Sequence, residues 1–184
     1  MAFGVLASVE ACQPLPVPPE APRPVPRWLG LDFARSQCAD AGPERCFDAR
    51  DDDCDGYIDE GCGLGTGPLQ FVLAWDVSDF DLDLEVRDPR GELVPLGRIS
   101  SSGLTREHDC PSEEWLCAGQ NVENVYLVWG EPERGLYEVS IRRRSGAEQA
   151  TAVTLTLGLR VEGETYISRV VLEADHEPRF ELTL

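Results

Sequence analysis

The clearest hydrophobic pattern in this chain begins at residue 69 and repeats every second residue. In residues 80–87 apolar side chains alternate with Asp81, Asp83 and Glu85, and in residues 153–161 valines and leucines alternate with smaller or polar residues. Since successive side chains of a β-strand point to opposite faces, this spacing predicts strands with one apolar and one solvated face. No convincing amphipathic helix interrupts the series.

Turn-forming residues separate the apolar segments, as at Pro89-Arg90-Gly91 and Gly163-Glu164. The predicted strands cover residues 69–76, 80–88, 124–129, 136–143, 150–162, 165–174 and 179–184. Seven or eight short strands of this kind are typical of an antiparallel β-sandwich. We therefore expect an all-β domain over residues 67–184.

The N-terminal part has a different composition. Residues 2–9 are apolar and closely precede Cys12, which loosely resembles a bacterial lipoprotein signal ending at a lipidated cysteine, without the usual basic start. Residues 13–30 then hold 7 of the 14 prolines, which favours an extended tether without a core. We expect a truncated signal over 1–12 with Cys12 as the lipidation candidate; a disordered leader is the alternative.

A small acidic, cysteine-rich module is expected at residues 31–66. Its cysteines, which recur every eight residues, are Cys38, Cys46, Cys54 and Cys62. So short a segment with few apolar side chains needs disulfides or a metal for stability. The cysteines lack C-x2-C spacing and carboxylates lie between them, which favours disulfides over zinc. Four cysteines permit three connectivities, and the sequence does not choose among them.

The acidic residues of this module follow a calcium-loop pattern. Seven of the 13 residues from 48 to 60 are acidic, and residues 51–59 read D-x-D-x-D-G-x-x-D, matching positions 1, 3, 5, 6 and 9 of an EF-hand-like loop. Alternate carboxylates can converge on one hard cation, and a glycine at position 6 permits the sharp turn. Cys62 stands at position 12, where an acid usually completes the coordination. The predicted Ca²⁺ ligands are Asp51, Asp53, Asp55, the Tyr57 carbonyl, Asp59 and Glu60, with Asp48 as an alternative to Glu60.

The stretch DDDCDGYIDEGC resembles the Asp-rich "DNDCDGxxDEGC" metal-binding motif of secreted and surface proteins of myxobacteria and related bacteria. The resemblance covers about 17 residues, from Cys46 to Cys62. It implies calcium binding outside the cytoplasm. This chain has Asp52 where the motif usually has asparagine, which keeps an oxygen donor, and it carries a single copy.

The alternation stops between Gly97 and Asn121, which predicts a long connection. Cys110 and Cys117 lie within it, and a disulfide between them would pin the segment. Trp115, in the same connection, is expected to pack on the sandwich; an exposed contact for a ligand is the alternative.

The sandwich region also resembles a known family. LAWDVSDFDLDLEVRDPRGELV, then SSSG, DC, ENVYLVW and GLYEVSI follow the order of motifs in YfaP-like bacterial domains of unknown function, with Glu85 at a position where the family commonly has histidine. The resemblance implies an immunoglobulin-like or jelly-roll sandwich outside the cytoplasm. It implies no catalytic residue.

Charge narrows the choice of partners. With 34 acidic and 16 basic side chains the net charge is −18, which argues against nucleic-acid binding. The only basic cluster, Arg142–Arg144, is expected to neutralise neighbouring carboxylates. Along a strand, every second side chain lies about 6–7 Å from the next, which is too far for Asp79, Asp81 and Asp83 to bind one ion together. The acids of residues 79–85 are therefore expected to form a solvated face. A second calcium site at Asp76, Asp79 and Asp81 is the alternative.

No catalytic constellation stands out. Ser100–Ser102, His108 and Asp109 are residue types of a hydrolase triad, but there is no G-x-S-x-G elbow and the segment is polar and irregular. We therefore expect a non-catalytic, exported calcium-binding protein, either an outer-membrane lipoprotein or a secreted protein, attached to a membrane only through a lipid anchor. A module that recognises a cell-surface polysaccharide or protein is the alternative, followed by an accessory domain of a secreted protease system.

Overall fold

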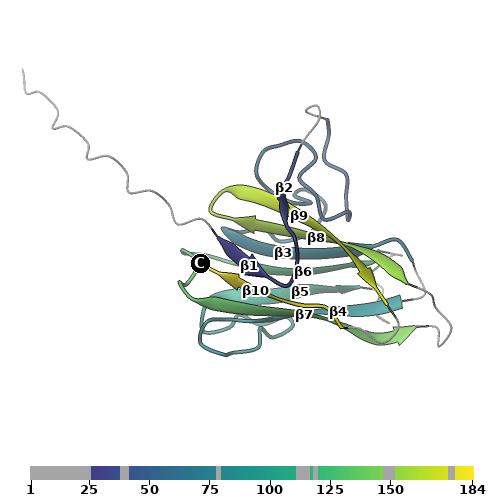
Figure 1. Cartoon of the computed structure of the whole chain (residues 1–184). Coiled ribbons are helices and arrows are strands. Elements are labelled where there is room, and N and C mark those ends of the chain that lie inside the picture. The colour runs from purple at the N-terminus through teal and green to yellow at the C-terminus, as the bar shows by residue number, and fades with distance from the viewer. Residues whose placement is uncertain are drawn as a thin grey trace, which may run out of the picture.

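The computed structural model describes residues 26–37, 42–77, 80–110, 117, 120–146, 152–173 and 177–184. Its named elements are all β-strands, in two antiparallel sheets that pack face to face as a β-sandwich (Figure 1). The strands are β1 (Arg27–Leu29), β2 (Ala34–Arg35), β3 (Leu69–Trp75), β4 (Phe80–Arg87), β5 (Leu104–Cys110), β6 (Val122–Leu127), β7 (Leu136–Gly146), β8 (Val153–Val161), β9 (Glu164–Leu172) and β10 (Arg179–Thr183). One sheet has the order β1-β10-β7-β4 and the other β2-β9-β8-β3-β6-β5.

The main core lies between the sheets and follows the predicted alternation. Leu82, Leu84 and Val86 of β4 are buried, as are Leu155, Leu157 and Leu159 of β8. The expected β-sandwich is therefore confirmed, and the apolar side of each predicted strand is the side that faces the other sheet.

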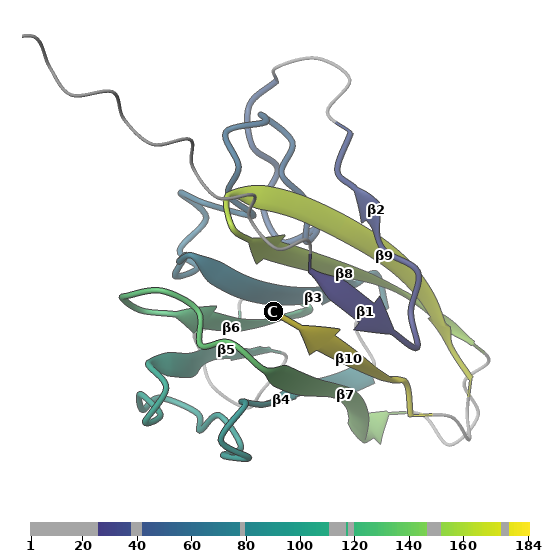
Figure 2. The ribbon, with the colours of Figure 1, turned by 60° about the vertical axis from the view of Figure 1, so that its left-hand side comes forward.

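The outer face of the six-stranded sheet is covered in part, which differs from the expected wet face. Every residue of β3 is buried, because the acidic module packs on its outer side (Figure 2). There Ala49 and Ile58 of the module contact Val72 and Ala74 of β3 in a second, smaller apolar cluster. The module is therefore fixed to the sandwich by its own core.

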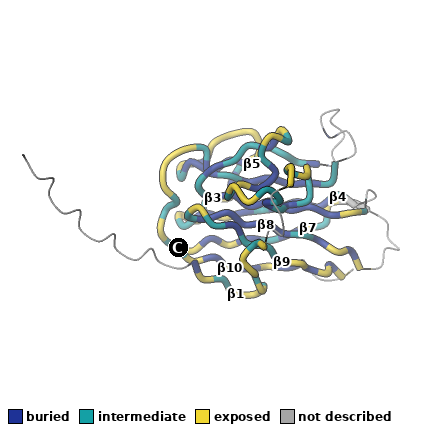
Figure 3. Tube along the Cα trace, turned by 90° about the horizontal axis from the view of Figure 1, so that it is seen from above, coloured by how far each residue is buried: buried dark blue, intermediate teal, exposed yellow. Residues whose placement is uncertain are grey.

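Three strands lie where none was predicted. β1 pairs with β10 and β2 pairs with β9, so residues assigned to the tether and to the module extend both sheets. β5 pairs with β6 inside the segment expected to be a long connection. Figure 3 shows how buried residues concentrate along the strands and exposed residues in the turns at their ends.

Disulfides join Cys46 to Cys62 and Cys110 to Cys117, and Cys54 is also disulfide-bonded. The predictions for Cys12, Cys38, Asp79 and Trp115 lie outside the described residues. Among those that are described, no helix has the length and apolarity needed to span a membrane.

Candidate metal centre

The backbone of the acidic loop folds in the register that the calcium-loop pattern predicts. The N–H of Asp55 donates to Asp53 Oδ1 at 3.1 Å, and the N–H of Tyr57 donates to Asp55 Oδ1 at 2.9 Å. The N–H of Gly56 donates to Asp51 Oδ2 at 3.2 Å. Gly56 has φ +88°, a left-handed conformation that glycine adopts without steric cost. These bonds turn the chain sharply and bring the alternate side chains onto one side.

Three of the predicted ligands come together. Asp51, Asp53 and Asp55 each place a carboxylate oxygen within 4.8 Å of the others. Asp51 is buried, Asp53 is half-buried and Asp55 is exposed, so the group runs from the sandwich surface to solvent. Carboxylates this close repel one another unless a cation lies between them.

A second group of acids shares Asp53 with the first. Glu44, Asp53 and Glu60 also have oxygens within 4.8 Å of one another. Glu60 was the expected substitute for the missing acid at position 12, and Glu44 was not predicted. Within the described part of the chain, the buried Oε2 atom of Glu60 has no hydrogen-bond partner. A cation in this group would satisfy that oxygen.

Glu44 reaches the loop because of the disulfide beside it. Cys46 pairs with Cys62, which brings the chain before the loop next to the end of the loop. Glu44 Oε2 accepts the N–H groups of Asp52 and Asp53 at 2.9 and 3.3 Å, and Oε1 accepts that of Asp59 at 2.9 Å. Glu44 lies two residues before Cys46, and this position could have identified it as a candidate ligand. The position is informative only when the Cys46–Cys62 disulfide is known.

Asp59 has a different role from the one predicted. It is fully buried, and its carboxylate accepts the N–H groups of Phe47, Asp48 and Ala49 at 2.7, 3.2 and 3.1 Å. Its oxygens therefore cap a backbone turn in front of the loop and do not join either group of converging acids. Phe47 and Ala49 have positive φ, a conformation that these hydrogen bonds help to hold.

Tyr57 and its neighbour Arg160 fix the loop to the sandwich. The Arg160 guanidinium, on β8, lies 4.1 Å from the centre of the Tyr57 ring and donates hydrogen bonds to the carbonyls of Gly56 and Gly67. On β9 the Thr165 hydroxyl donates to Asp51 Oδ2 at 2.9 Å. The acid at loop position 1 is thus held directly by a strand of the six-stranded sheet.

The pKa values of Glu44 and Glu60, in the second group of acids, are both raised. Burial, with added repulsion from Glu60, raises the pKa of Glu44 to about 7. Burial also raises the pKa of Glu60, and repulsion from Asp55, Asp53 and Asp51 acts in the same direction. A bound cation would favour the ionised form of each acid.

The expectation of a solvated acidic face on residues 79–85 is wrong for Asp83, which is buried at 3% exposure. Arg106 and Arg144 form ion pairs with it, and Arg142 pairs with Glu85 at 3.0 Å. The expectation that Arg142 and Arg144 neutralise neighbouring carboxylates is confirmed. Asp83 is buried because β4 packs toward β5 and β6 of the other sheet.

Comparison with family models, with curated proteins and with solved structures finds no match for this chain. The two resemblances drawn from its motifs stay predictions, and the candidate site rests on the residues described above.

Proposed function

We propose that this protein is a non-catalytic, exported protein that binds Ca²⁺ in the loop at residues 51–60 and holds a β-sandwich in a fixed position next to that loop. The observation that carries the proposal is the convergence of Asp51, Asp53 and Asp55 in calcium-loop register. Glu60 and Glu44 lie where they can complete the set of oxygen ligands.

The chemistry of the donors supports calcium over zinc. All the side chains that converge are carboxylates, and Ca²⁺ takes 6–8 oxygen ligands in a flexible geometry. Zinc prefers thiolate and imidazole ligands. Cys46, Cys54 and Cys62 are all disulfide-bonded and supply no thiolate.

The contacts of the loop suggest what the cation does. Thr165 binds Asp51, and Arg160 binds the Gly56 carbonyl, so the loop is held by β8 and β9. A cation that draws the carboxylates together would stiffen the loop against this sheet. Binding energy would then add to the stability of the whole folded chain.

Export and lack of catalysis are further parts of the proposal. The disulfides favour an oxidising compartment. His108, the histidine of the suspected triad, has Nε2 2.8 Å from Gln120 and its ring stacked with Phe47. Ser100 Oγ lies 2.9 Å from Ser102 Oγ and accepts the N–H of Leu104 at 3.1 Å. These contacts favour a structural role for both residues.

The test is calorimetric titration of the oxidised full chain with Ca²⁺, Mg²⁺ and Zn²⁺. We expect saturable Ca²⁺ binding that is lost in the variant Asp51→Asn, Asp53→Asn, Asp55→Asn. The control variant Glu138→Gln, Glu173→Gln, Glu181→Gln removes the same amount of charge from exposed positions and should bind Ca²⁺ like the wild type. Equal heats for the two variants would overturn the proposal.

A recognition module is the second candidate, and one observation favours it. Trp129, just after β6, is 61% exposed and offers an aromatic ring for stacking on a sugar or a partner protein. Binding on a glycan array that Trp129→Ala abolishes would support this function. An array without binding would leave calcium binding as the better account.

A further inference from the structure

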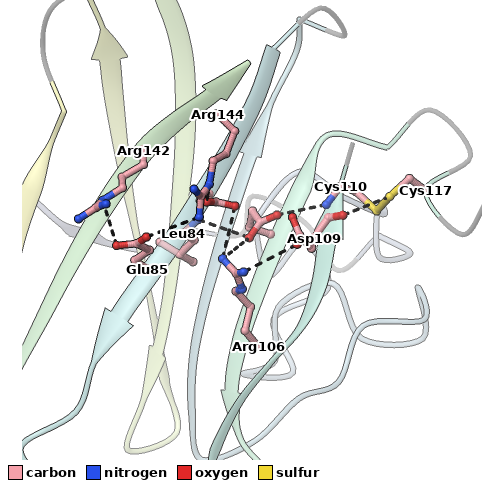
Figure 4. A network of polar contacts seen from close by, with 10 residues as sticks. Leu84, Glu85, Arg106, Asp109, Cys110, Cys117, Arg142 and Arg144 are labelled. Carbon is pink, nitrogen blue, oxygen red and sulfur yellow. Dashed lines mark hydrogen bonds and ion pairs between the residues drawn. A yellow bond between two sulfur atoms is a disulfide. The ribbon is translucent and has the colours of Figure 1, made fainter. Parts of the chain in front are cut away.

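A partly buried network of charged side chains closes one side of the sandwich. β4 is an edge strand of the four-stranded sheet and β5 is an edge strand of the six-stranded sheet, and the two contact each other here. Figure 4 shows Arg106 and Arg144 directed toward one shared group of carboxylates. The members, from four strands, are Asp83 of β4, Arg106 and Asp109 of β5, Glu123 of β6 and Arg144 of β7.

Glu123 joins the two sheets. It is fully buried, on the side of β6 that faces the core. Its Oε2 atom accepts the N–H of Leu84, on the edge strand β4, at 3.4 Å. Its Oε1 atom accepts the N–H of Cys110, at the end of β5, at 3.1 Å. One carboxyl group therefore satisfies backbone donors from both sheets.

Arg106 lies among the three acids of the network. Its Nη1 atom is 3.4 Å from Asp83 and 3.9 Å from Glu123, and its Nη2 atom is 3.7 Å from Asp109. Although these carboxylates are close enough to hold a metal ion, the guanidinium already provides the positive charge at their centre. We therefore treat the network as an ion-pair cluster and not as a metal site.

The charges balance only if one acid is protonated. Arg106 and Arg144 supply two positive charges, and three ionised acids would supply three negative charges. Carboxylate oxygens of Glu123 and Asp109 also lie within 4.8 Å of each other. Two acids this close repel each other when both are ionised, and a single proton held between them relieves that repulsion. Burial, together with the charge of Asp109, raises the pKa of Glu123 to about 10.

We propose that the Glu123–Asp109 pair holds a single proton at neutral pH and acts as a proton-dependent lock that joins edge strand β5 to β4. Loss of the proton places an unbalanced charge inside the sandwich and loosens this side. Two ionisable groups nearby have partners outside the network. Glu107 binds the Gly65 N–H, and His108 pairs with Gln120. On β4, Glu85 lies 3.9 Å from Arg144 and pairs with Arg142 at 3.0 Å, so this fourth acid is matched by a third guanidinium and the excess of one negative charge stays the same.

The sign of the pH effect follows from proton linkage. In the unfolded chain Glu123 ionises near the ordinary glutamate pKa, whereas in the folded chain it keeps its proton. Unfolding therefore releases this proton at neutral pH, and stability falls as pH rises between the two pKa values. Between pH 6 and pH 9, release of this proton on unfolding should lower the folding equilibrium constant by about tenfold for each pH unit.

The experiment is urea unfolding of the full chain, with disulfides intact, at pH 6, 7, 8 and 9. Glu123→Gln keeps a neutral side chain of the same shape. Its free energy of unfolding should therefore fall less steeply with pH than that of the wild type, by the contribution of one proton. Glu181→Gln, at an exposed position, is the control and should run parallel to the wild type. Parallel curves for Glu123→Gln and the wild type would overturn the proposal.

Asp109→Asn tests the pairing itself. It removes the charge that helps to keep Glu123 protonated. The pH above which the free energy of unfolding stops falling should therefore be lower than in the wild type. An unchanged curve would contradict the shared proton. If Glu123→Gln does not fold, the carboxyl ¹³C resonance of Glu123 in the wild type decides. It should report the protonated acid at pH 8, and a carboxylate signal there would refute the lock.

Discussion

Removal of the Asp59 carboxylate should destabilise the acidic module more than any other single change to an acid of the loop. Asp59 is fully buried and accepts three backbone N–H groups, from Phe47, Asp48 and Ala49. Asp59→Ala leaves these donors unpaired beside the apolar cluster that holds the module on β3. A buried donor left without a partner costs about 1–3 kcal/mol.

The expected loss for Asp59→Ala is about 4 kcal/mol, which allows for partial relaxation of the turn. Asp59→Asn keeps one acceptor oxygen but turns an amide N–H toward a backbone donor, so about 2 kcal/mol is expected. The assay is urea unfolding at pH 7.5 with and without Ca²⁺. The loss should be present in both conditions because Asp59 acts through the backbone.

Asp32→Ala is the control for Asp59. Asp32 is exposed, so its removal should change the free energy of unfolding by less than about 0.5 kcal/mol. A loss below about 1 kcal/mol for Asp59→Ala would refute the reasoning. It would mean that solvent replaces the carboxylate. If Asp59→Asn instead lowered Ca²⁺ affinity as strongly as Asp53→Asn without a loss of stability, Asp59 would be a ligand.

Three other predictions concern the packing of the acidic module on β8, the Cys46–Cys62 disulfide and the ionisation of Glu44. Gly158→Ala should cost about 1–3 kcal/mol in urea unfolding, because a methyl group there overlaps the Ala49 carbonyl; wild-type stability would show that the module does not pack on β8. The double variant Cys46→Ser, Cys62→Ser should lose about 3 kcal/mol of stability and bind Ca²⁺ more weakly by calorimetry, and unchanged affinity would exclude the disulfide as a clamp. Since burial raises the pKa of Glu44 to about 7, Ca²⁺ affinity should be about tenfold lower at pH 6 than at pH 8, and Glu44→Gln should remove that difference if Glu44 is a ligand.

Strand positions could be predicted from the sequence wherever both the apolar pattern and the strand were long. The alternation of β4 and β8 identifies their core faces, as Leu84 and Leu157 show. β1 and β2 were missed because they have three and two residues and depend on pairing with β10 and β9, which are far away in the sequence. No local pattern reports such a pairing.

The buried acid of β6 was missed although its position carries a signal. Glu123 alternates with Val125 and Leu127, which are both buried in the core. The alternation of side chains along the strand therefore places a glutamate on the apolar face. A glutamate in such a position indicates a paired or protonated side chain. The expected strand began one residue later, so the conflict was not visible.

The candidate metal site could be predicted in part. The spacing of Asp51, Asp53 and Asp55 is local, and the loop brings them together as expected. Glu44 depends on the pairing of Cys46 with Cys62, which four cysteines leave undetermined. Asp59 fits the ligand pattern equally well, and only its backbone partners show that it caps a turn.

The central claim is that one divalent cation gathers the loop carboxylates, and a crystal structure of the oxidised protein grown with saturating CaCl₂ tests it most directly. The account predicts one ion bound by oxygens of Asp51, Asp53 and Asp55, with a further carboxylate from Glu60 or Glu44. Loop carboxylates bound only by water and protein groups at saturating calcium would contradict it.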